Sequence, residues 1–170
     1  LDLEDWTAGL DSVINEQAGD GSALVTLLMG TVDLRSLELR YANAGHPPPL
    51  VLGGADVVVG PMSGPPLGVH PGAKLRTHTV PLHRDSSVLM VTDGIFEGHV
   101  APGAAGRVGF DEFAVEAGRD DPRDQGYLDR LADSLQVRNG GPMPDDVAAV
   151  LISLHVDVRD VVVPEAVTSR

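Results

Sequence analysis

The segment VLMVTDGIFEG, residues 88–98, places a continuous apolar run directly before a Thr-Asp-Gly step. The run at 88–91 is typical of a strand buried on both faces, because its apolar residues do not alternate with polar ones. A buried strand has little use for a carboxylate at its end unless a partner or a ligand compensates the charge. Asp93 is therefore the first candidate functional residue of the chain.

The composition favours a single globular domain and disfavours binding to polyanions. The chain has 170 residues, 42% of them hydrophobic, enough for one domain that buries about two-thirds of its unfolded surface. Its 25 acidic and 12 basic residues give a formal net charge of −13. Such a field repels phosphate backbones and anionic lipid. We therefore expect no nucleic-acid partner.

Cysteine and hydropathy patterns predict a cytoplasmic protein. The chain has no cysteine, which excludes disulfides and thiolate metal sites and is typical of a reducing compartment. No apolar stretch approaches the roughly 20 residues that span a bilayer, and the first five residues are acidic where a signal peptide would be basic. We expect no membrane partner. The abrupt start without methionine indicates part of a longer protein.

The order of predicted elements is one helix, many strands, two helices and a closing strand. The first helix has Trp6, Leu10, Val13 and Ile14 at helical spacing. Glycine- and proline-rich segments at 60–72 and 98–109 predict irregular loops. This order favours an α+β fold with a mostly antiparallel sheet. The predicted helices are 3–17, 110–118 and 124–136, and the predicted strands are 23–33, 37–45, a pair around Gly53-Gly54, 74–82, 88–92 and 145–156.

A second carboxylate site, Asp145-Asp146, opens the last predicted strand. If that strand is an antiparallel neighbour of 88–92, its beginning meets the end that carries Asp93. Converging carboxylates repel one another unless a proton or a cation lies between them, and hard oxygen ligands favour Mg²⁺ or Mn²⁺. The alternative is that Asp-Gly is a turn and Asp-Asp a solvated loop. For either motif alone, that alternative is the more common.

The segment YANAGHPPPL, residues 41–50, holds a third candidate group. Asn43 and Gly45 suit a tight turn, and three prolines stiffen the chain after His46. Considered alone, His46 is best interpreted as a hydrogen-bonded turn histidine. The other five histidines are scattered without the spacing of metal ligands.

Four segments together resemble the PPM (type 2C) serine/threonine protein phosphatases, most closely the bacterial SpoIIE/RsbU subgroup. They are YANAGHPPPLVL, GPPLGV, VLMVTDGIFE and PDDVAAVLI, which occur in the family's order between residues 3 and 156. The resemblance implies an αββα sandwich, with mostly antiparallel sheets flanked by helices and a two-metal centre of Mn²⁺ or Mg²⁺ at one end. It implies that a metal-activated water hydrolyses phosphoserine or phosphothreonine on a protein of the anti-anti-sigma type.

The resemblance also implies roles for individual residues. Asp93 and Asp145 match metal ligands, and Glu97 matches an acid associated with a third, looser ion. Four further residues are expected near the site without a settled role: Asn43, His46, Gly94 and Asp146. Gly68, in the segment GPPLGV, matches a loop that we interpret as structural.

The chain departs from the family at its N-terminal side. The family's Gly-Asp-x-x-Gly-His-Gly motif, whose Asp bridges both metals, is missing, and we interpret Asp20 as a turn residue. We therefore expect residues 1–156 to be the C-terminal portion of a phosphatase domain that is inactive by itself, followed by a tail at 157–170.

Two alternatives and one consequence of this departure stay open. The first alternative is a non-catalytic regulatory or binding module that retains the phosphatase fold. The second is an unrelated β-rich binding domain in which the aspartates are only turn residues. If strands are missing, the sheets have exposed edges, which predicts a homodimer.

Overall fold

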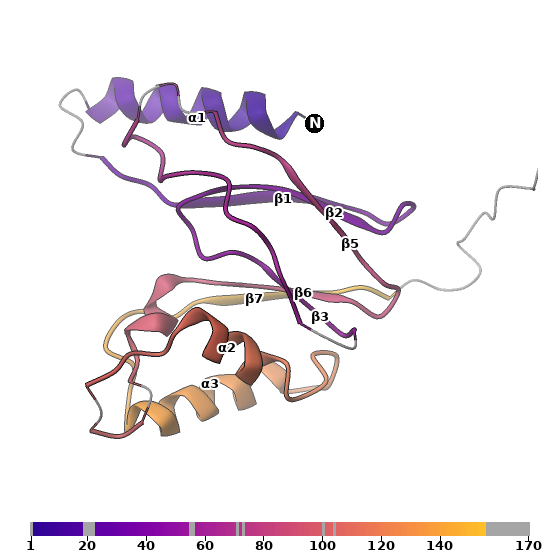
Figure 1. Cartoon of the computed structure of the whole chain (residues 1–170), viewed down its shortest axis with the longest axis vertical. Helices are drawn as coiled ribbons and strands as arrows, with labels where there is room; N and C mark the ends of the chain where they lie inside the picture. Colours follow the sequence, from indigo (N-terminus) through magenta and orange to yellow (C-terminus); the bar gives the residue numbers. More distant parts are fainter. Residues whose placement is uncertain are drawn as a thin grey trace, which may run out of the picture.

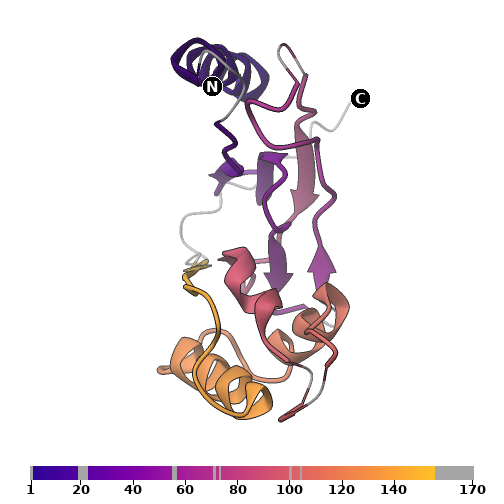
Figure 2. The same cartoon turned by 90° about the vertical axis from the view of Figure 1, so that its left-hand side faces the viewer.

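The computed structural model describes residues 2–18, 23–54, 57–70, 72, 74–99, 101–103 and 105–155. Asp20 and the predicted tail at 157–170 lie outside them. The described elements form four layers, in which one helix covers the first of two stacked sheets and two helices cover the second (Figure 1). The view at a right angle shows the same succession (Figure 2). The predicted α+β class and the αββα arrangement are confirmed.

All strand pairings are antiparallel. The three-stranded sheet has the order β1-β2-β5 and the four-stranded sheet the order β4-β3-β6-β7. The strands are β1 (Leu27–Asp33), β2 (Glu38–Ala44), β3 (Leu50–Leu52), β4 (Val58–Val59), β5 (His78–Pro81), β6 (Ser87–Val91) and β7 (Ala149–Ser153). The helices are α1 (Leu3–Ala18), α2 (Phe110–Ala117), α3 (Tyr127–Asn139) and the short 3-10 helix η1 (Asp93–Glu97).

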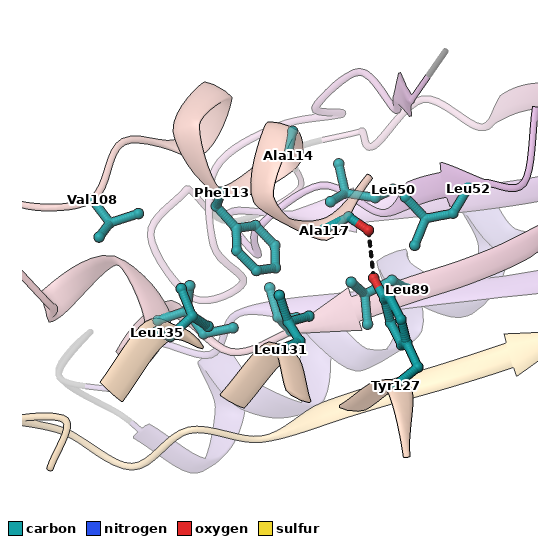
Figure 3. Close-up of a cluster of buried hydrophobic side chains, with 12 residues drawn as sticks. Leu50, Leu52, Leu89, Val108, Phe113, Ala114, Ala117, Tyr127, Leu131 and Leu135 are labelled. Atoms are coloured by element: carbon teal, nitrogen blue, oxygen red, sulfur yellow. Dashed lines mark hydrogen bonds between the residues drawn. The ribbon is translucent and has the colours of Figure 1, made fainter. Parts of the chain in front are cut away.

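Strand β6 is buried on both faces, as its continuous apolar run predicts. Leu89 belongs to the cluster beneath α2 and α3 (Figure 3), whereas Val88 belongs to the cluster between the two sheets. Both side chains are at most 1% exposed. Because consecutive side chains of a strand point to opposite faces, this one strand serves both cores. Because β6 is packed on both faces, it is a rigid base for the residues that follow it, including Asp93.

The buried face of α1 differs from the one that its apolar spacing predicts. Trp6 and Val13 are 56% and 53% exposed, so the prediction was wrong for both. The buried face instead includes Leu3, Thr7 and Asp11, each at most 3% exposed. The two polar residues are tolerated there because the Thr7 hydroxyl bonds to a helix carbonyl and Asp11 accepts backbone N–H groups.

Several other element boundaries differ from the predicted ones; the first strand, for example, begins at Leu27 and not at 23. The last strand begins at Ala149, so Asp145 and Asp146 lie in the loop before it. The third helix begins at Tyr127 and not at 124, because Gly126 has φ 78° and interrupts a right-handed helix there. In the part of the chain that the structure describes, no helix combines the length and the apolar character that crossing a membrane requires.

Candidate functional site

The pairing of β6 with β7 brings the two aspartate motifs to the same end of the second sheet. Val91 lies opposite Ala149 in the antiparallel register, and the Thr92 N–H donates to the Ala148 carbonyl at 3.0 Å. Asp93 therefore follows the end of β6 at the point where the loop with Asp145 enters β7. The expectation that these strands are antiparallel neighbours is confirmed.

The backbones of the two motifs are in contact at Gly94. A Cβ atom at this position would lie 2.3 Å from the Asp146 carbonyl oxygen and 3.5 Å from the Asp145 carbonyl carbon. Only glycine allows this approach without a shift of one of the two chains. Gly94 itself is buried. Gly94 was predicted near the site, and this close approach is the steric reason why a glycine lies beside the aspartates.

The aspartate side chains of both motifs lie at the surface. Asp93, Asp145 and Asp146 are all exposed. An Asp145 carboxylate oxygen accepts the Asp146 N–H at 2.8 Å, which fixes the loop locally. Among the described residues, no lysine or arginine forms an ion pair with any of the three. Within the described part of the chain, the negative charge of the three aspartates is therefore not compensated by an ion pair with a lysine or an arginine.

Asn43 shapes the turn that carries His46. Its side-chain amide donates to the His46 carbonyl at 2.8 Å, and its side-chain oxygen accepts the His46 N–H at 3.1 Å. The Asn43 N–H in turn donates to the Ser63 hydroxyl at 2.9 Å. Gly45, with φ 65°, lets the chain reverse between them. Asn43 is completely buried, so its place in the site is that of a support for the turn.

The His46 ring lies beside the end of β6. It hydrogen-bonds to the Val91 carbonyl and faces the charge of Asp93, and its Nδ1 is 3.4 Å from the Thr26 hydroxyl. Burial lowers the pKa of His46 below its usual value, and the Asp93 charge and the Val91 hydrogen bond only partly oppose this. Burial thus favours the neutral form of the ring. The structure thus brings His46 and Asp93 together.

Glu97 is engaged elsewhere. Its carboxylate forms an ion pair with Arg107, whose guanidinium also donates to the Glu97 carbonyl at 2.9 Å. Among the described residues, no group of three His, Asp or Glu side chains stands close enough together to hold a metal ion. The predicted ligands Asp93, Asp145 and Glu97 therefore do not form such a group by themselves, and their ligand roles stay predictions.

A comparison with protein families gives this arrangement a context. The family model described as Stage II sporulation protein E (SpoIIE) matches residues 1–155. The chain belongs to the SpoIIE family. The predicted resemblance to SpoIIE-type, PP2C-like phosphatase domains is thereby confirmed.

Solved structures with the same fold include a SpoIIE phosphatase domain and a PP2C domain. The RsbU and RsbW domains of a Mycobacterium tuberculosis protein match with a TM-score of 0.69 at 25% identity, over 91% of this chain and 43% of that one. The phosphatase domain of Bacillus subtilis SpoIIE, presoaked with Mn, matches with 0.63 at 18%, over 92% and 68%. The SiaA-PP2C domain of Pseudomonas aeruginosa matches with 0.68 at 23%, over 89% and 58%. The chain thus spans less than half of the first structure.

The side chains at this candidate site have the donor chemistry of a Mg²⁺ or Mn²⁺ site. Asp93 and Asp145 offer carboxylate oxygens, which these hard cations prefer. Mg²⁺ in particular is usually held by one or two carboxylates, with water and substrate phosphate completing its shell. The residues present therefore fit a divalent cation, as ligands for part of its coordination shell.

Sequence reasoning missed three residues that organise this site. Thr92 links the end of β6 to the loop before β7 through its hydroxyl. Ser63 supports Asn43, and Arg107 pairs with Glu97. The only signal in the sequence is the position of Thr92 beside Asp93, since the other two lie far along the chain from their partners.

Proposed function

We propose that the chain is part of a metal-dependent serine/threonine protein phosphatase of the bacterial regulatory type. The observation that carries this proposal is the contact between Gly94 and the Asp146 carbonyl. It joins the two aspartate motifs at one end of the sandwich, in a chain that belongs to the SpoIIE family. If the two aspartate motifs were independent turns of an unrelated domain, nothing would require their backbones to approach each other so closely.

Asp93 and Asp145 are proposed as ligands of Mn²⁺ or Mg²⁺. A bound cation of this kind supplies an activated water and neutralises charge on a phosphoryl group. The protein keeps the ligand-bearing backbones in place through Gly94 and the β6–β7 pairing. Burial favours the neutral form of His46 beside Asp93, which disfavours an ion pair between the ring and that carboxylate. Glu97, paired with Arg107, is proposed only as a ligand of a further, weaker ion.

The proposed substrate is a phosphoprotein of the anti-anti-sigma type. The M. tuberculosis structure similar to this chain combines an RsbU with an RsbW domain, which supports a regulatory phosphoprotein partner. The formal net charge of −13 opposes a phosphorylated substrate over most of the surface. Binding of the phosphoryl group is therefore expected only where cations neutralise the aspartates.

The test is Mn²⁺-dependent hydrolysis of a phosphoserine peptide by the full-length protein. Asp93→Asn and Asp145→Asn are expected to lower kcat/KM by about 100-fold or more, because each removes a charged ligand of the ion that carries the chemistry. Asp133→Asn, at an exposed position of α3, is the matched control and is expected to retain activity. Equal activity of all three variants, or full activity in EDTA, would contradict the proposal.

The second candidate is a non-catalytic binding module of the same family. The absence of a three-residue metal cluster among the described residues and the engagement of Glu97 by Arg107 favour it. Under this alternative, the protein binds a phosphopeptide with the same affinity in EDTA and in Mn²⁺ and releases no phosphate. Phosphate release that depends on Mn²⁺ and on Asp93 decides against it.

A further inference from the structure

The Thr92 hydroxyl joins the end of β6 to the loop that carries both aspartates of the second motif. Its Oγ1 accepts the Ala148 N–H at 2.9 Å and lies 3.3 Å from the Asp146 carbonyl, to which it can donate. The Thr92 N–H donates to the Ala148 carbonyl at 3.0 Å. One residue thus makes both backbone and side-chain bonds to the same short segment, just outside the regular ladder of β6 and β7.

The Asp146 carbonyl is held from two sides. The Thr92 hydroxyl lies on one side of it, and Gly94 approaches it so closely that a Cβ atom would stand 2.3 Å away. The two supporting residues flank Asp93 in the chain. The position of the loop relative to Asp93 therefore depends on a hydroxyl as an attractive contact and on a glycine as a steric stop.

The Thr92 hydroxyl is not needed to satisfy backbone groups that are buried away from water. Ala148 and Asp146 are both exposed, so water can replace the Thr92 hydroxyl as a partner of their N–H and carbonyl groups. Loss of the hydroxyl is therefore expected to change the global stability little. What water cannot replace is the fixed connection between the loop and the residue that precedes Asp93.

We propose that Thr92 is a positioning residue for divalent-cation binding, which sets the Asp145-Asp146 loop against Asp93. This rests on the proposed function, in which both motifs supply carboxylates to one ion. Hydrogen bonds that orient metal ligands typically change metal affinity by about 10- to 100-fold when they are removed. The hydroxyl of Thr92 acts through the backbone of the ligand-bearing loop and does not itself touch the ion.

The experiment compares Thr92→Val with Thr92→Ser in the full-length protein. Valine keeps the shape of threonine and removes the hydroxyl, whereas serine keeps the hydroxyl. Thr7→Val is the matched control, because it removes a threonine hydroxyl that bonds only within α1. The first measurement is hydrogen exchange at the Ala148 amide without metal. The second is the dissociation constant of Mn²⁺ alone, by electron paramagnetic resonance.

We expect Thr92→Val to speed exchange at Ala148 and to weaken Mn²⁺ binding by about 10-fold or more, with Thr92→Ser and Thr7→Val close to wild type in both. Melting temperatures within about 4 °C of wild type would place the effect in the loop and not in the overall fold. Unchanged exchange in Thr92→Val overturns the connection itself. Faster exchange with unchanged Mn²⁺ affinity overturns the positioning role.

Asp93→Asn separates failure of this inference from failure of the proposed function. If wild type and Asp93→Asn bind Mn²⁺ equally, the cation site is refuted, and the positioning role is refuted with it. If Asp93→Asn abolishes Mn²⁺ binding while Thr92→Val leaves it unchanged, the cation site stands and only the role of Thr92 is overturned.

Discussion

Glu116 of α2 lies buried against Arg138 of α3, with 2.5 Å between its Oε2 and the arginine Nη2. The Ser134 hydroxyl donates to the other carboxylate oxygen. Arg119 adds a second guanidinium at 2.8 Å from Oε2. A carboxylate that is only 5% exposed is thus satisfied by Ser134 and Arg138 of α3 and by Arg119, which follows α2 in the chain. This network holds together the helical layer above β3 and β6.

Replacing Glu116 by alanine is expected to destabilise the fold by about 2–4 kcal/mol. The change leaves Arg138, whose side chain is 22% exposed, without its partner, and removal of one member of a buried pair costs more than the pair itself contributes. Asp133→Ala, on the exposed face of α3, is expected to change stability by less than about 0.5 kcal/mol. Urea denaturation measures both, and equal effects would contradict the role of the network.

Asp11→Asn is expected to loosen the loop that packs on α1. The Asp11 carboxylate accepts the Gly68 N–H at 2.8 Å and the Gly72 N–H at 3.1 Å, so an amide NH₂ in place of one oxygen faces a donor. The expected cost is about 1–3 kcal/mol, with faster hydrogen exchange at both glycines. Glu16→Gln, which removes a negative charge near the C-terminus of the same helix, is expected not to destabilise. Protected glycine amides in Asp11→Asn would contradict this prediction.

The sequence was sufficient for the layers and for the meeting of the two motifs. A continuous apolar run at 88–91 can be satisfied only between two cores, and antiparallel pairing then brings Asp93 to the start of the last strand. Two of the four motifs that resemble the phosphatases contain most of these strands, and the motif YANAGHPPPLVL contains β3, the neighbour of β6. For this reason, the sequence alone was sufficient to infer both the family and the fold class.

The remaining features depend on tertiary contacts that no local pattern encodes. Periodicity marks Trp6 as a core residue of α1, yet it is 56% exposed, because the buried face is completed by Asp11 and its distant partners. Glu97 resembles a metal-associated acid, but its direction is set by Arg107, ten residues further along the chain. Such pairings between separated residues are set by the path of the loops in the folded chain.

Gly94→Ala is expected to destabilise the protein, whereas Gly9→Ala is expected to stabilise it. At Gly94 the added methyl group would meet the Asp146 carbonyl oxygen at 2.3 Å, and relief of such a clash costs about 1–3 kcal/mol. At Gly9, inside α1, nothing lies within 4 Å, and alanine lowers the entropy of the unfolded chain, a gain of about 0.4–1 kcal/mol. Denaturation midpoints that move in the same direction for both variants would contradict this steric argument.

Alkaline pH is expected to destabilise the protein through its two buried tyrosines. Burial raises the pKa of both Tyr41 and Tyr127 from 10 to about 12, with the Asp120 charge as a smaller cause at Tyr127. The unfolded chain therefore releases these protons first, so the stabilisation is complete below pH 10 and is lost as the pH rises towards 12.

Tyr127→Phe separates the two tyrosines. Below pH 10 the variant is expected to be less stable by about 1 kcal/mol, because the Tyr127 hydroxyl donates to the Ala117 carbonyl at 2.7 Å (Figure 3). Above pH 10 this difference is expected to shrink, since only the wild type then loses the contribution of Tyr127. Urea denaturation between pH 8 and 11.5 measures it, and a difference that grows with pH would contradict the assignment.

The open edge of β7 is expected to cause self-association. Within the described residues, β7 pairs only with β6. Val150 and Ile152, on one face of the strand, are 53% and 40% exposed. An unpaired strand edge with exposed apolar residues is a template for pairing with a second copy. We expect the sedimentation coefficient of the 170-residue chain to rise with concentration, and the double variant Val150→Lys, Ile152→Lys to remain monomeric.

Val115→Lys, at a residue of α2 that is 64% exposed, is the control for an effect of charge alone. A helix has no unpaired edge, so this variant is expected to associate like the wild type. If all three proteins sediment as monomers at every concentration, the edge does not pair with a second copy. If Val115→Lys also abolishes association, the contact lies on the helical layer and not on the edge of the sheet.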